Sequence, residues 1–386
     1  MAAALARCRL GARRVPRLSA SVLGGLRAQS SASMESMEEY VDHVTETISA
    51  RAVPQIVNGS SLEAHEYLRR HSPSSQLDGH DAPTVHPTAI VHPNAELGRH
   101  VRVGPYSIVG PDAVLENGVC LMAHVVVDGL TRIGRGTTVH PFACIGGEPQ
   151  DKKHRIHMEQ RLSSSSPSSL VIGSNCVIRE HATIHGSTSY TRNSPTMVGD
   201  DCWVLCGAHI GHDVKVGDRV VISNNVCIAG HVNIGDFAII GGQVGIKQFV
   251  KIGSLAMIGG QSAVDGDVLP YGLVVGNRAK LVGMNLVGLR RARISRSNIK
   301  LMLRVYRYLF DATASCSKTG FAPPLDLPFR KSVVLRAEEV AKYLDERQIG
   351  AETSPMVHEM VQFVSESPQR CRSSLCAAAI STHGKH

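Results

Sequence analysis

Two histidines and an aspartate lie close together in the segment 206–213, which reads Cys-Gly-Ala-His-Ile-Gly-His-Asp. His209 and His212 flank an isoleucine, and Asp213 follows His212 directly. An imidazole beside a carboxylate is a candidate general base, because the carboxylate fixes the tautomer of the ring and supports the imidazolium that forms. The segment therefore predicts a site for proton transfer centred on His212.

Three further histidines extend this group: His231 in Ala-Gly-His-Val at 229–232, and His181 and His185 upstream. Three imidazoles can also hold Zn²⁺, and polar side chains are common on any protein surface. The spacing leaves three interpretations open: a general base, a zinc site, or ordinary surface histidines.

The elements that must position these side chains repeat every six residues. From Val198 to Val264 every sixth residue is aliphatic without a miss, and an earlier run does the same from Val85 to Ile145. Period six is neither the period of an α-helix nor that of a simple strand. It is typical of a hexapeptide parallel β-helix, in which short strands wind into a prism. With three more hexads from Ile172, the 26 hexads predict roughly eight to nine coils.

A coil of 18 residues has consequences for the histidines. The aliphatic Ile210 points into the prism, so His209 and His212 lie on a corner or outer face that a ligand can reach. One coil further along the chain, Gly230 stacks on His212, and His231 lies beside it. We expect Gly, Asn or Asp at corners that need a positive φ.

The chain divides into five parts. We predict a transit peptide at 1–33, a poorly ordered extension at 34–83, the β-helix at 84–276, a helical domain at 277–367 and a disordered tail at 368–386. The leader is rich in Arg, Ala and Ser and has no acid, which is typical of an organelle transit peptide. We expect the mitochondrial matrix, with the chloroplast as second choice.

Smaller features break the hexad pattern. Residues 148–170 leave the register and end in a Ser-rich tract, which predicts a flexible surface loop, and 186–197 form a second excursion. The Gly- and Asn-rich segment 270–288 reads as irregular. Further on, 332–347 and 354–365 are predicted helices. Another helix is predicted after Leu289, with one face formed by Ile299, Leu303, Tyr306 and Phe310.

Composition narrows the class of protein. Of 386 residues only 4% are aromatic, which suits a core of stacked Val, Ile and Ala. The net charge is +8, but six arginines and no acid fall within residues 1–34, so the rest carries only +2 and does not suggest nucleic-acid binding. No window has the apolar length of a membrane span. The ten cysteines include no CxxC pair, which favours a reducing compartment.

Four motifs occur in the order known from one family: Gly-Glu-Pro-Gln-Asp at 147–151, Ala-His-Ile-Gly-His-Asp at 208–213, Ala-Gly-His-Val at 229–232 and Asn-Leu-Val-Gly-Leu-Arg-Arg at 285–291. Over about 84–310 the chain resembles the acyl-[acyl-carrier-protein]–UDP-N-acetylglucosamine O-acyltransferases of lipid A biosynthesis. With its Arg-rich leader it resembles the plant mitochondrial form. The resemblance, and not the spacing, implies a left-handed β-helix that forms a homotrimer, with active sites between subunits.

The resemblance also implies a reaction. A (3R)-3-hydroxyacyl group passes from acyl carrier protein to the 3-hydroxyl of UDP-N-acetylglucosamine, as the first step of a lipid A-type pathway. His212 would be the catalytic base, Asp213 would orient it, and the Gly230 N–H would stabilise the oxyanion. The family needs no metal and no cofactor beyond the phosphopantetheine that enters on the carrier.

Other residues match family positions that contact the substrates. A flexible loop that meets the nucleotide-sugar and phosphopantetheine corresponds to Gln150, Asp151 and Lys153. The UDP-sugar site corresponds to His209, His231, Gln248, Asn285 and Arg291, and the end of the acyl groove to Met257 and Gly260. Because Gly260 has no side chain, we expect a long acyl chain. Lys247 replaces a common family His but could still contact phosphate, and Val287 replaces a family acid.

A basic stretch, 278–307, has nine Lys and Arg residues and no acid. It is either a solvated helical face or a docking surface for an acidic partner, steered by charge. The resemblance favours the second interpretation, because the family's partner is the acidic acyl carrier protein.

Three other functions remain possible at the level of sequence. One is a mitochondrial γ-carbonic-anhydrase-like subunit, which binds Zn²⁺ or is purely structural. Another is a hexapeptide acyltransferase that acts on coenzyme A or on a different sugar. The third is a degenerate scaffold without activity.

Overall fold

The computed structural model describes most of the chain beyond residue 80. The described residues are 81–153, 169–189, 194–310, 332–347, 354–366 and 375–376. The predicted transit peptide, nearly all of the predicted extension and most of the predicted tail lie outside them. The Ser-rich part of the predicted loop at 148–170 does so as well.

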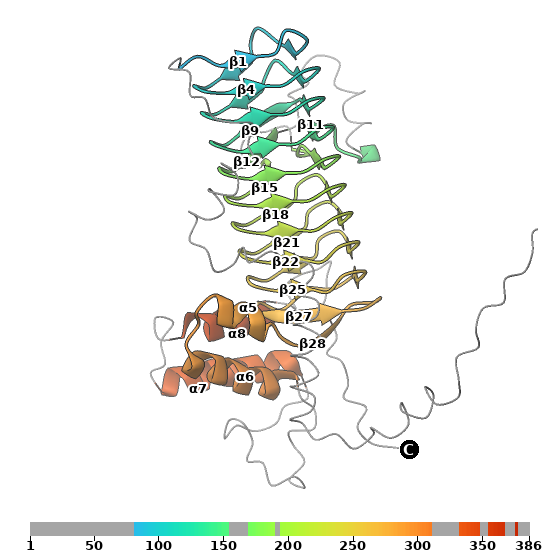
Figure 1. The fold of residues 1–386 in the computed structure, drawn as a ribbon. Coiled ribbons are helices and arrows are strands. Elements are labelled where there is room, and N and C mark those ends of the chain that lie inside the picture. Colours follow the sequence, from blue (N-terminus) through green and yellow to red (C-terminus); the bar gives the residue numbers. More distant parts are fainter. Residues whose placement is uncertain are drawn as a thin grey trace, which may run out of the picture. The chain divides into compact units, whose positions relative to one another are not determined.

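The hexads form 26 short strands, β1 to β26, that fill three parallel sheets in rotation (Figure 1). The first sheet contains β1 (Thr84–Val85), β4 (Arg102–Val103), β7 (Cys120–Leu121), β10 (Thr138–Val139), β13 (Val177–Ile178), β16 (Trp203–Val204), β19 (Val221–Ile222), β22 (Ile239–Ile240) and β25 (Met257–Ile258). The second contains β2 (Ile90–Val91), β5 (Ile108–Val109), β8 (Val126–Val127), β11 (Cys144–Gly147), β14 (Thr183–His185), β17 (His209–Ile210), β20 (Cys227–Ile228), β23 (Gly245–Ile246) and β26 (Ala263–Val264). The third contains β3 (Glu96–Leu97), β6 (Val114–Leu115), β9 (Leu130–Ile133), β12 (Ser169–Ile172), β15 (Thr196–Val198), β18 (Lys215–Val216), β21 (Asn233–Ile234) and β24 (Lys251–Ile252).

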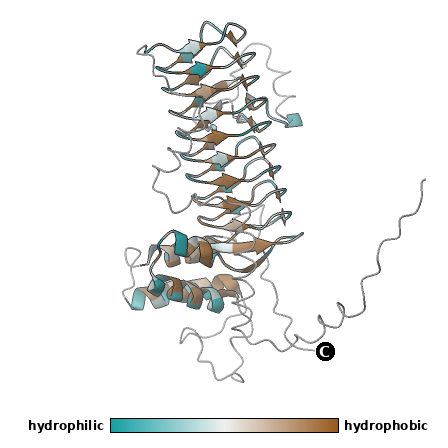
Figure 2. Ribbon diagram, in the orientation of Figure 1, coloured by the Kyte–Doolittle hydropathy of each residue, from teal (hydrophilic) through white to brown (hydrophobic). Residues whose placement is uncertain are grey.

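The core lies inside this prism. The repeating aliphatics of the long run are buried, and Ile210, Ile222, Ile228 and Ile240 are fully buried. Figure 2 shows the apolar colour recurring strand after strand along the stack. Val85, in the first described coil, is 39% exposed. Each inner face is thus buried by the neighbouring coils, as expected for a repeat protein.

Corners between strands use the left-handed backbone region, with the expected Gly, Asn and Asp but also with other residues. Positive φ occurs at Asn175 and Asp213, and also at bulky residues such as Tyr106, His231 and Phe249. The expectation of Gly, Asn or Asp was therefore too narrow. Aromatic corner residues of successive coils stack on one another, and this contact offsets part of the backbone cost.

The register survives two breaks in the 18-residue repeat. β10 pairs with β13 at a spacing of 39 residues (Thr138 with Val177), and β13 pairs with β16 at a spacing of 26 (Val177 with Trp203). Both insertions emerge between strands, so the ladder continues across them.

Beyond β26 one prediction was wrong. The segment 270–288 is not irregular: β27 (Gly272–Val275) extends the first sheet parallel to β25, and β28 (Lys280–Met284) returns antiparallel to β27. This hairpin lacks the period of six, so the hexad pattern could not reveal it. The β-sheet thus continues past residue 276.

Four helices follow among the described residues: α5 (Leu286–Arg291), α6 (Arg296–Phe310), α7 (Val333–Glu346) and α8 (Pro355–Ser365). The helices predicted over 332–347 and 354–365 are confirmed as α7 and α8. The buried face of α6 differs from the prediction, because Met302, Val305, Tyr308 and Leu309 are buried while Ile299, Leu303, Tyr306 and Phe310 are only partly so.

Helix α8 is joined to the β-helix by polar contacts. The Tyr271 hydroxyl donates a hydrogen bond to the Glu359 carboxylate, and Lys251 Nζ lies 3.4 Å from Glu366 Oε2. Within the described parts of the chain, no helix is long and apolar enough to cross a membrane.

Candidate active site

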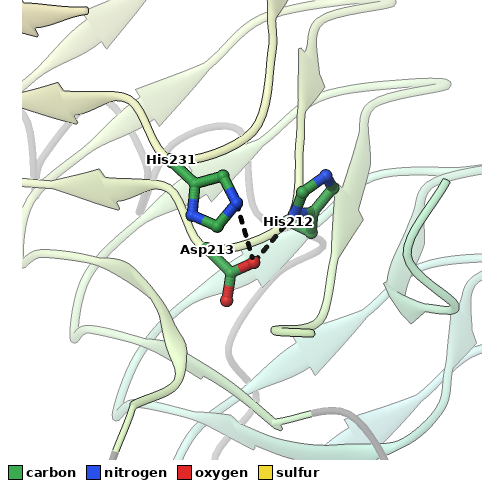
Figure 3. A group of neighbouring side chains, drawn as sticks. All are labelled: His212, Asp213 and His231. Carbon is green, nitrogen blue, oxygen red and sulfur yellow. Dashed lines mark hydrogen bonds and ion pairs between the residues drawn. The ribbon is translucent and has the colours of Figure 1, made fainter. Parts of the chain in front are cut away.

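His212 and Asp213 form a hydrogen-bonded pair at the corner between β17 and β18. His212 Nδ1 lies 2.8 Å from Asp213 Oδ2 (Figure 3), and both side chains are largely buried, at 7% and 12% exposed. With Nδ1 donating to the carboxylate, Nε2 of the same ring can accept a proton. The predicted general-base geometry is therefore present.

Asp213 is held by four hydrogen bonds with Ser187, Thr188 and Thr196 besides the one with His212. Its Oδ1 accepts hydrogen bonds from the Ser187 hydroxyl at 2.5 Å and the Thr188 amide at 3.1 Å, while its Oδ2 accepts one from the Thr188 hydroxyl at 2.7 Å. Its own amide donates to Thr196 Oγ1. Burial would raise the pKa of Asp213, but the hydrogen bonds from His212, Ser187 and Thr188 and the charge of His231 outweigh it and hold the pKa far below its usual range.

Ser187, Thr188 and Thr196 were missed by the sequence reasoning. They lie in the excursion 186–197, which interrupts the hexads, so no stacking rule predicted that they would meet Asp213. The signal that could have found them is the position of this excursion, one coil before the His-Asp pair.

Gly230 lies against His212 in the next coil, as the 18-residue repeat predicts. A Cβ atom at Gly230 would lie 2.5 Å from His212 Cε1, so any side chain there would displace the ring. His231 donates its amide to the His212 carbonyl, whereas the Gly230 N–H donates to no acceptor among the described residues. The site thus offers a free backbone donor directly beside the base.

His231 completes the corner. Its Nε2 lies 3.7 Å from Asp213 Oδ2, and its ring meets the His212 ring edge-on at 5.1 Å between centroids. On its other side the ring stacks on Phe249 at 4.7 Å.

Two more histidines lie on the adjoining strands of the second sheet. His209 Nδ1 is 2.8 Å from Thr183 Oγ1, and His185 packs edge-on against His209 with no hydrogen-bond partner at its buried Nδ1. Burial, and then the neighbouring His209 and His212, lower the pKa of His185 to about 4. Burial also lowers the pKa of His209. Both rings are therefore held in the neutral form.

His181 does not join this cluster, contrary to our expectation. It is exposed at another corner and stacks on Phe142 at 5.1 Å, in a column that continues through His124 to Tyr106. The excursion 186–197 lies between His181 and His212, so Thr183 pairs with His209 at a spacing of 26 residues and not 18. Counting back from His212 in steps of 18 therefore misplaces His181.

A pocket of about 730 Å³ opens beside His212. The predicted site residues that line it are Gln150, His209, His212, Gly230, Lys247 and Gln248. Asp265, Asn277 and Arg278 line it too and were not predicted; Arg278 Nη1 lies 2.5 Å from Asp265 Oδ2. Its polar and charged side chains, set among apolar residues such as Ile246 and Val264, suit a charged, hydroxylated ligand.

Several predicted contact residues do not line this pocket within a single chain. Asp151 accepts a hydrogen bond from the Lys153 amide. Asn285 caps α5 by accepting from the Gly288 amide, and its amide group donates to the Leu255 carbonyl. The other predicted site residues that do not line the pocket are Asp213 and His231, whose contacts are given above, Arg291 in α5, Met257 in β25 and Gly260 at the following corner. Their roles stay predictions.

Among the described residues, one group of three side chains could hold a metal ion, namely His212, Asp213 and His231. It consists of two imidazoles and a carboxylate, and not of the three imidazoles that the sequence suggested. The geometry alone is thus compatible with a base or with a metal ligand set.

The chain is similar to known family models and to characterised enzymes. A family model described as UDP-N-acetylglucosamine O-acyltransferase, domain 2, matches residues 267–373, and a bacterial transferase hexapeptide model matches 195–230. The chain is 54% identical over 227 residues to the acyl-[acyl-carrier-protein]–UDP-N-acetylglucosamine O-acyltransferase of Caulobacter vibrioides, covering 59% of this chain and 82% of that protein. It is 44% identical over 228 residues to the enzyme of the same name from Agrobacterium fabrum, a match that covers 59% of this chain and 80% of that protein.

Solved structures agree. The UDP-N-acetylglucosamine acyltransferase of Arabidopsis superposes with a TM-score of 0.61 at 32% identity, covering 76% of this chain and 99% of that one. The enzyme from Campylobacter jejuni superposes with a TM-score of 0.61 at 31% identity, covering 76% of this chain and 99% of that one. These likenesses, with the hexapeptide repeats and parallel sheets, confirm a left-handed parallel β-helix followed by helices.

Proposed function

The chain belongs to the acyl-[acyl-carrier-protein]–UDP-N-acetylglucosamine O-acyltransferase family and is an acyltransferase; on that premise we propose that it transfers a (3R)-3-hydroxyacyl group from acyl carrier protein to the 3-hydroxyl of UDP-N-acetylglucosamine. This is the first step of a lipid A-type pathway in the family. The observation that carries the proposal is the buried His212–Asp213 pair beside the N–H of Gly230, which donates to no acceptor in the part of the chain that the structure describes.

The arrangement supports a direct transfer. His212 Nε2 removes the proton of the sugar 3-hydroxyl as its oxygen attacks the thioester carbonyl. The Gly230 N–H donates to the oxyanion of the tetrahedral intermediate, a contribution of about 3–4 kcal/mol for one well-placed donor. The intermediate expels the phosphopantetheine thiolate, which receives the proton from the imidazolium. Asp213 remains a carboxylate throughout, because its pKa is far below its usual range.

The test is an acyl-transfer assay with the full chain, UDP-N-acetylglucosamine and 3-hydroxyacyl carrier protein. Formation of the sugar ester is expected, and a coenzyme A thioester in place of the carrier should be a poor donor. Absence of ester with every 3-hydroxyacyl length from short to long would refute the proposed reaction.

Chain length is a finer part of the proposal. At Gly260 a Cβ atom would meet the Gly242 carbonyl at 3.3 Å, so the space there is open only because no side chain is present. Gly260→Met is expected to shift preference toward shorter acyl chains. Unchanged selectivity across a series of carrier substrates would show that the groove ends elsewhere.

We also propose a homotrimer with shared sites. This proposal is supported by the position of Arg291, which the resemblance places at the UDP-sugar although it does not line the pocket of its own chain. Light scattering should give three chains. Co-expression of His212→Ala with Arg291→Ala should restore activity that neither has alone, because mixed trimers contain a site with both residues intact.

The basic stretch 278–307 is proposed to dock the acidic carrier. Its nine cationic residues are exposed except for Arg291, which is half-buried. Arg293→Glu with Arg296→Glu should raise the KM for the carrier substrate at low salt and have less effect at high salt. An unchanged KM at low salt would contradict docking here.

Localisation is proposed from the leader alone. Residues 1–83 fused to a fluorescent protein should direct it to the mitochondrial matrix of a plant cell. Targeting to chloroplasts would favour our second choice.

A further inference from the structure

We propose that His212, Asp213 and His231 bind one divalent transition-metal ion, with Zn²⁺ as the representative, and that this ion inhibits the enzyme. The binding part rests on the geometry in Figure 3. The inhibition part rests on the proposed function, in which His212 is the base.

The three donor atoms are already close to a coordination geometry. His212 Nδ1 lies 2.8 Å and His231 Nε2 lies 3.7 Å from Asp213 Oδ2, and all three atoms lie within 4.8 Å of one another. In a tetrahedral zinc site the bonds are about 2.0–2.2 Å, which puts neighbouring donor atoms about 3.3 Å apart. The two distances to Asp213 therefore need to change by roughly half an ångström, and the two imidazole nitrogens, at most 4.8 Å apart, need to approach each other by up to about 1.5 Å.

The chemistry of the donors selects the kind of ion. Two imidazole nitrogens with one carboxylate oxygen are a donor set that binds Zn²⁺ and leaves a fourth position open. Imidazole suits Zn²⁺, Co²⁺, Ni²⁺ and Cu²⁺, whereas Mg²⁺ prefers oxygen ligands. The site should therefore bind the former group and not Mg²⁺.

Neighbouring residues hold two of the ligands in place. Ser187 and Thr188 donate to the Asp213 carboxylate, and Phe249 stacks on the His231 ring. Such outer contacts orient metal ligands and commonly change affinity by 10- to 100-fold. The corner is therefore preorganised for coordination as well as for catalysis.

Coordination would remove the base. In the resting pair, Nδ1 of His212 carries the proton shared with Asp213 and Nε2 is free to accept one. A metal on Nδ1 moves that proton to Nε2, so the ring can then donate to the sugar hydroxyl but cannot deprotonate it. The ion should therefore lower kcat more than it raises KM.

Binding is tested on the full chain after chelator treatment and dialysis. Calorimetric titration with Zn²⁺ is expected to give one ion per chain, and Mg²⁺ none. His231→Gln should weaken binding at least 10-fold. The matched control is His181→Gln, because His181 has the same left-handed backbone (φ 59° against 62°) and also stacks on a phenylalanine, yet has no carboxylate in a metal-binding group with it.

Two results would overturn the site: no zinc binding by the wild type, or equal affinity in the wild type and His231→Gln. Co²⁺ supplies an independent signature, since a tetrahedral site gives strong visible bands. A thiolate-to-cobalt band would instead place the ion on a cysteine such as the exposed Cys227 and would also refute the proposal.

Activity measurements with and without Zn²⁺ test the inhibition proposal separately from the proposed function. Stoichiometric Zn²⁺ should lower kcat at least 10-fold, and excess chelator should restore it, while equal Mg²⁺ has no effect. Zinc binding without loss of kcat would refute inhibition. If the metal-free enzyme forms no ester at all, the proposed function fails, and the titration still decides the metal site.

Discussion

His181 and His231 occupy two different corners of the same β-helix and share both a left-handed backbone and a stacked phenylalanine. They differ in what surrounds them. His181 belongs to an exposed column of rings, whereas His231 faces the buried carboxylate of Asp213 and the edge of the His212 ring. The comparison shows that the β-helix alone can place a stacked histidine at a corner. A buried, hydrogen-bonded acid next to it creates a reactive site.

The sharpest test of this difference removes the base. His212→Ala should lower kcat/KM for acyl transfer by about 10³-fold, within the usual range for general-base catalysis. His181→Ala should change it less than threefold, because His181 lies in the other column. Steady-state kinetics on both variants provide the measurement. Similar losses in the two would mean that the corners are not functionally distinct.

A second test uses glycines at equivalent positions of the two corners. In Gly230→Ala the new methyl group would lie 2.5 Å from the His212 ring, so we expect about a 100-fold loss of kcat. In Gly242→Ala the methyl would meet only the Asn224 carbonyl at 3.5 Å, an ordinary contact. Full activity in Gly230→Ala would show that neither the ring position nor the adjacent N–H is critical.

A third test weakens the support of the acid. Ser187→Ala removes a hydrogen bond to Asp213 Oδ1 but leaves both bonds from Thr188. We expect about a 10-fold loss of kcat, with the KM for UDP-N-acetylglucosamine nearly unchanged, because Ser187 positions Asp213 and is not proposed to touch substrate. Ser187→Thr, which keeps a hydroxyl, should recover most of the rate. If the effect appeared in KM alone, a substrate contact would replace this positioning role.

The smallest effect concerns stability. Burial holds the pKa of His185 near 4, against about 6.5 in an unfolded chain, so the unfolded state binds more protons between these values. The free energy of unfolding should therefore fall as pH drops from 6.5 to 4, by up to about 3 kcal/mol from this residue. His185→Gln should flatten this slope in denaturant titrations at several pH values. An unchanged slope would assign the acid sensitivity to other groups.

The β-helix could be predicted because its period is exceptionally regular. Each inner residue from Val198 to Val264 is specified by stacking on the coils before and after, so one rule places all of them. The same rule placed Gly230 against His212. The rule failed where the period of six is interrupted. The β27–β28 hairpin was missed, and His181 was assigned to the wrong corner because the excursion 186–197 lies between it and His212.

The candidate site was only partly predictable for the same reason. The base, its acid and Gly230 lie in regular coils and could be located by counting, whereas Ser187, Thr188 and Arg278 lie in segments without the repeat. Their contacts depend on how two irregular segments fold against the β-helix. A periodic sequence pattern contains no information about that folding. Comparison with known proteins, and not geometry, identified the chain as an acyltransferase, and the role of His212 as its base stays a proposal.

The two interruptions of the repeat have a consequence for redesign. Strands pair in register across gaps of 39 and 26 residues as well as across 18. The register of the β-helix therefore depends on pairing between neighbouring strands and not on the length of chain that connects them. Corners should accept grafted loops of very different size, so substrate range could be altered by exchanging loops around an unchanged His212 and Asp213.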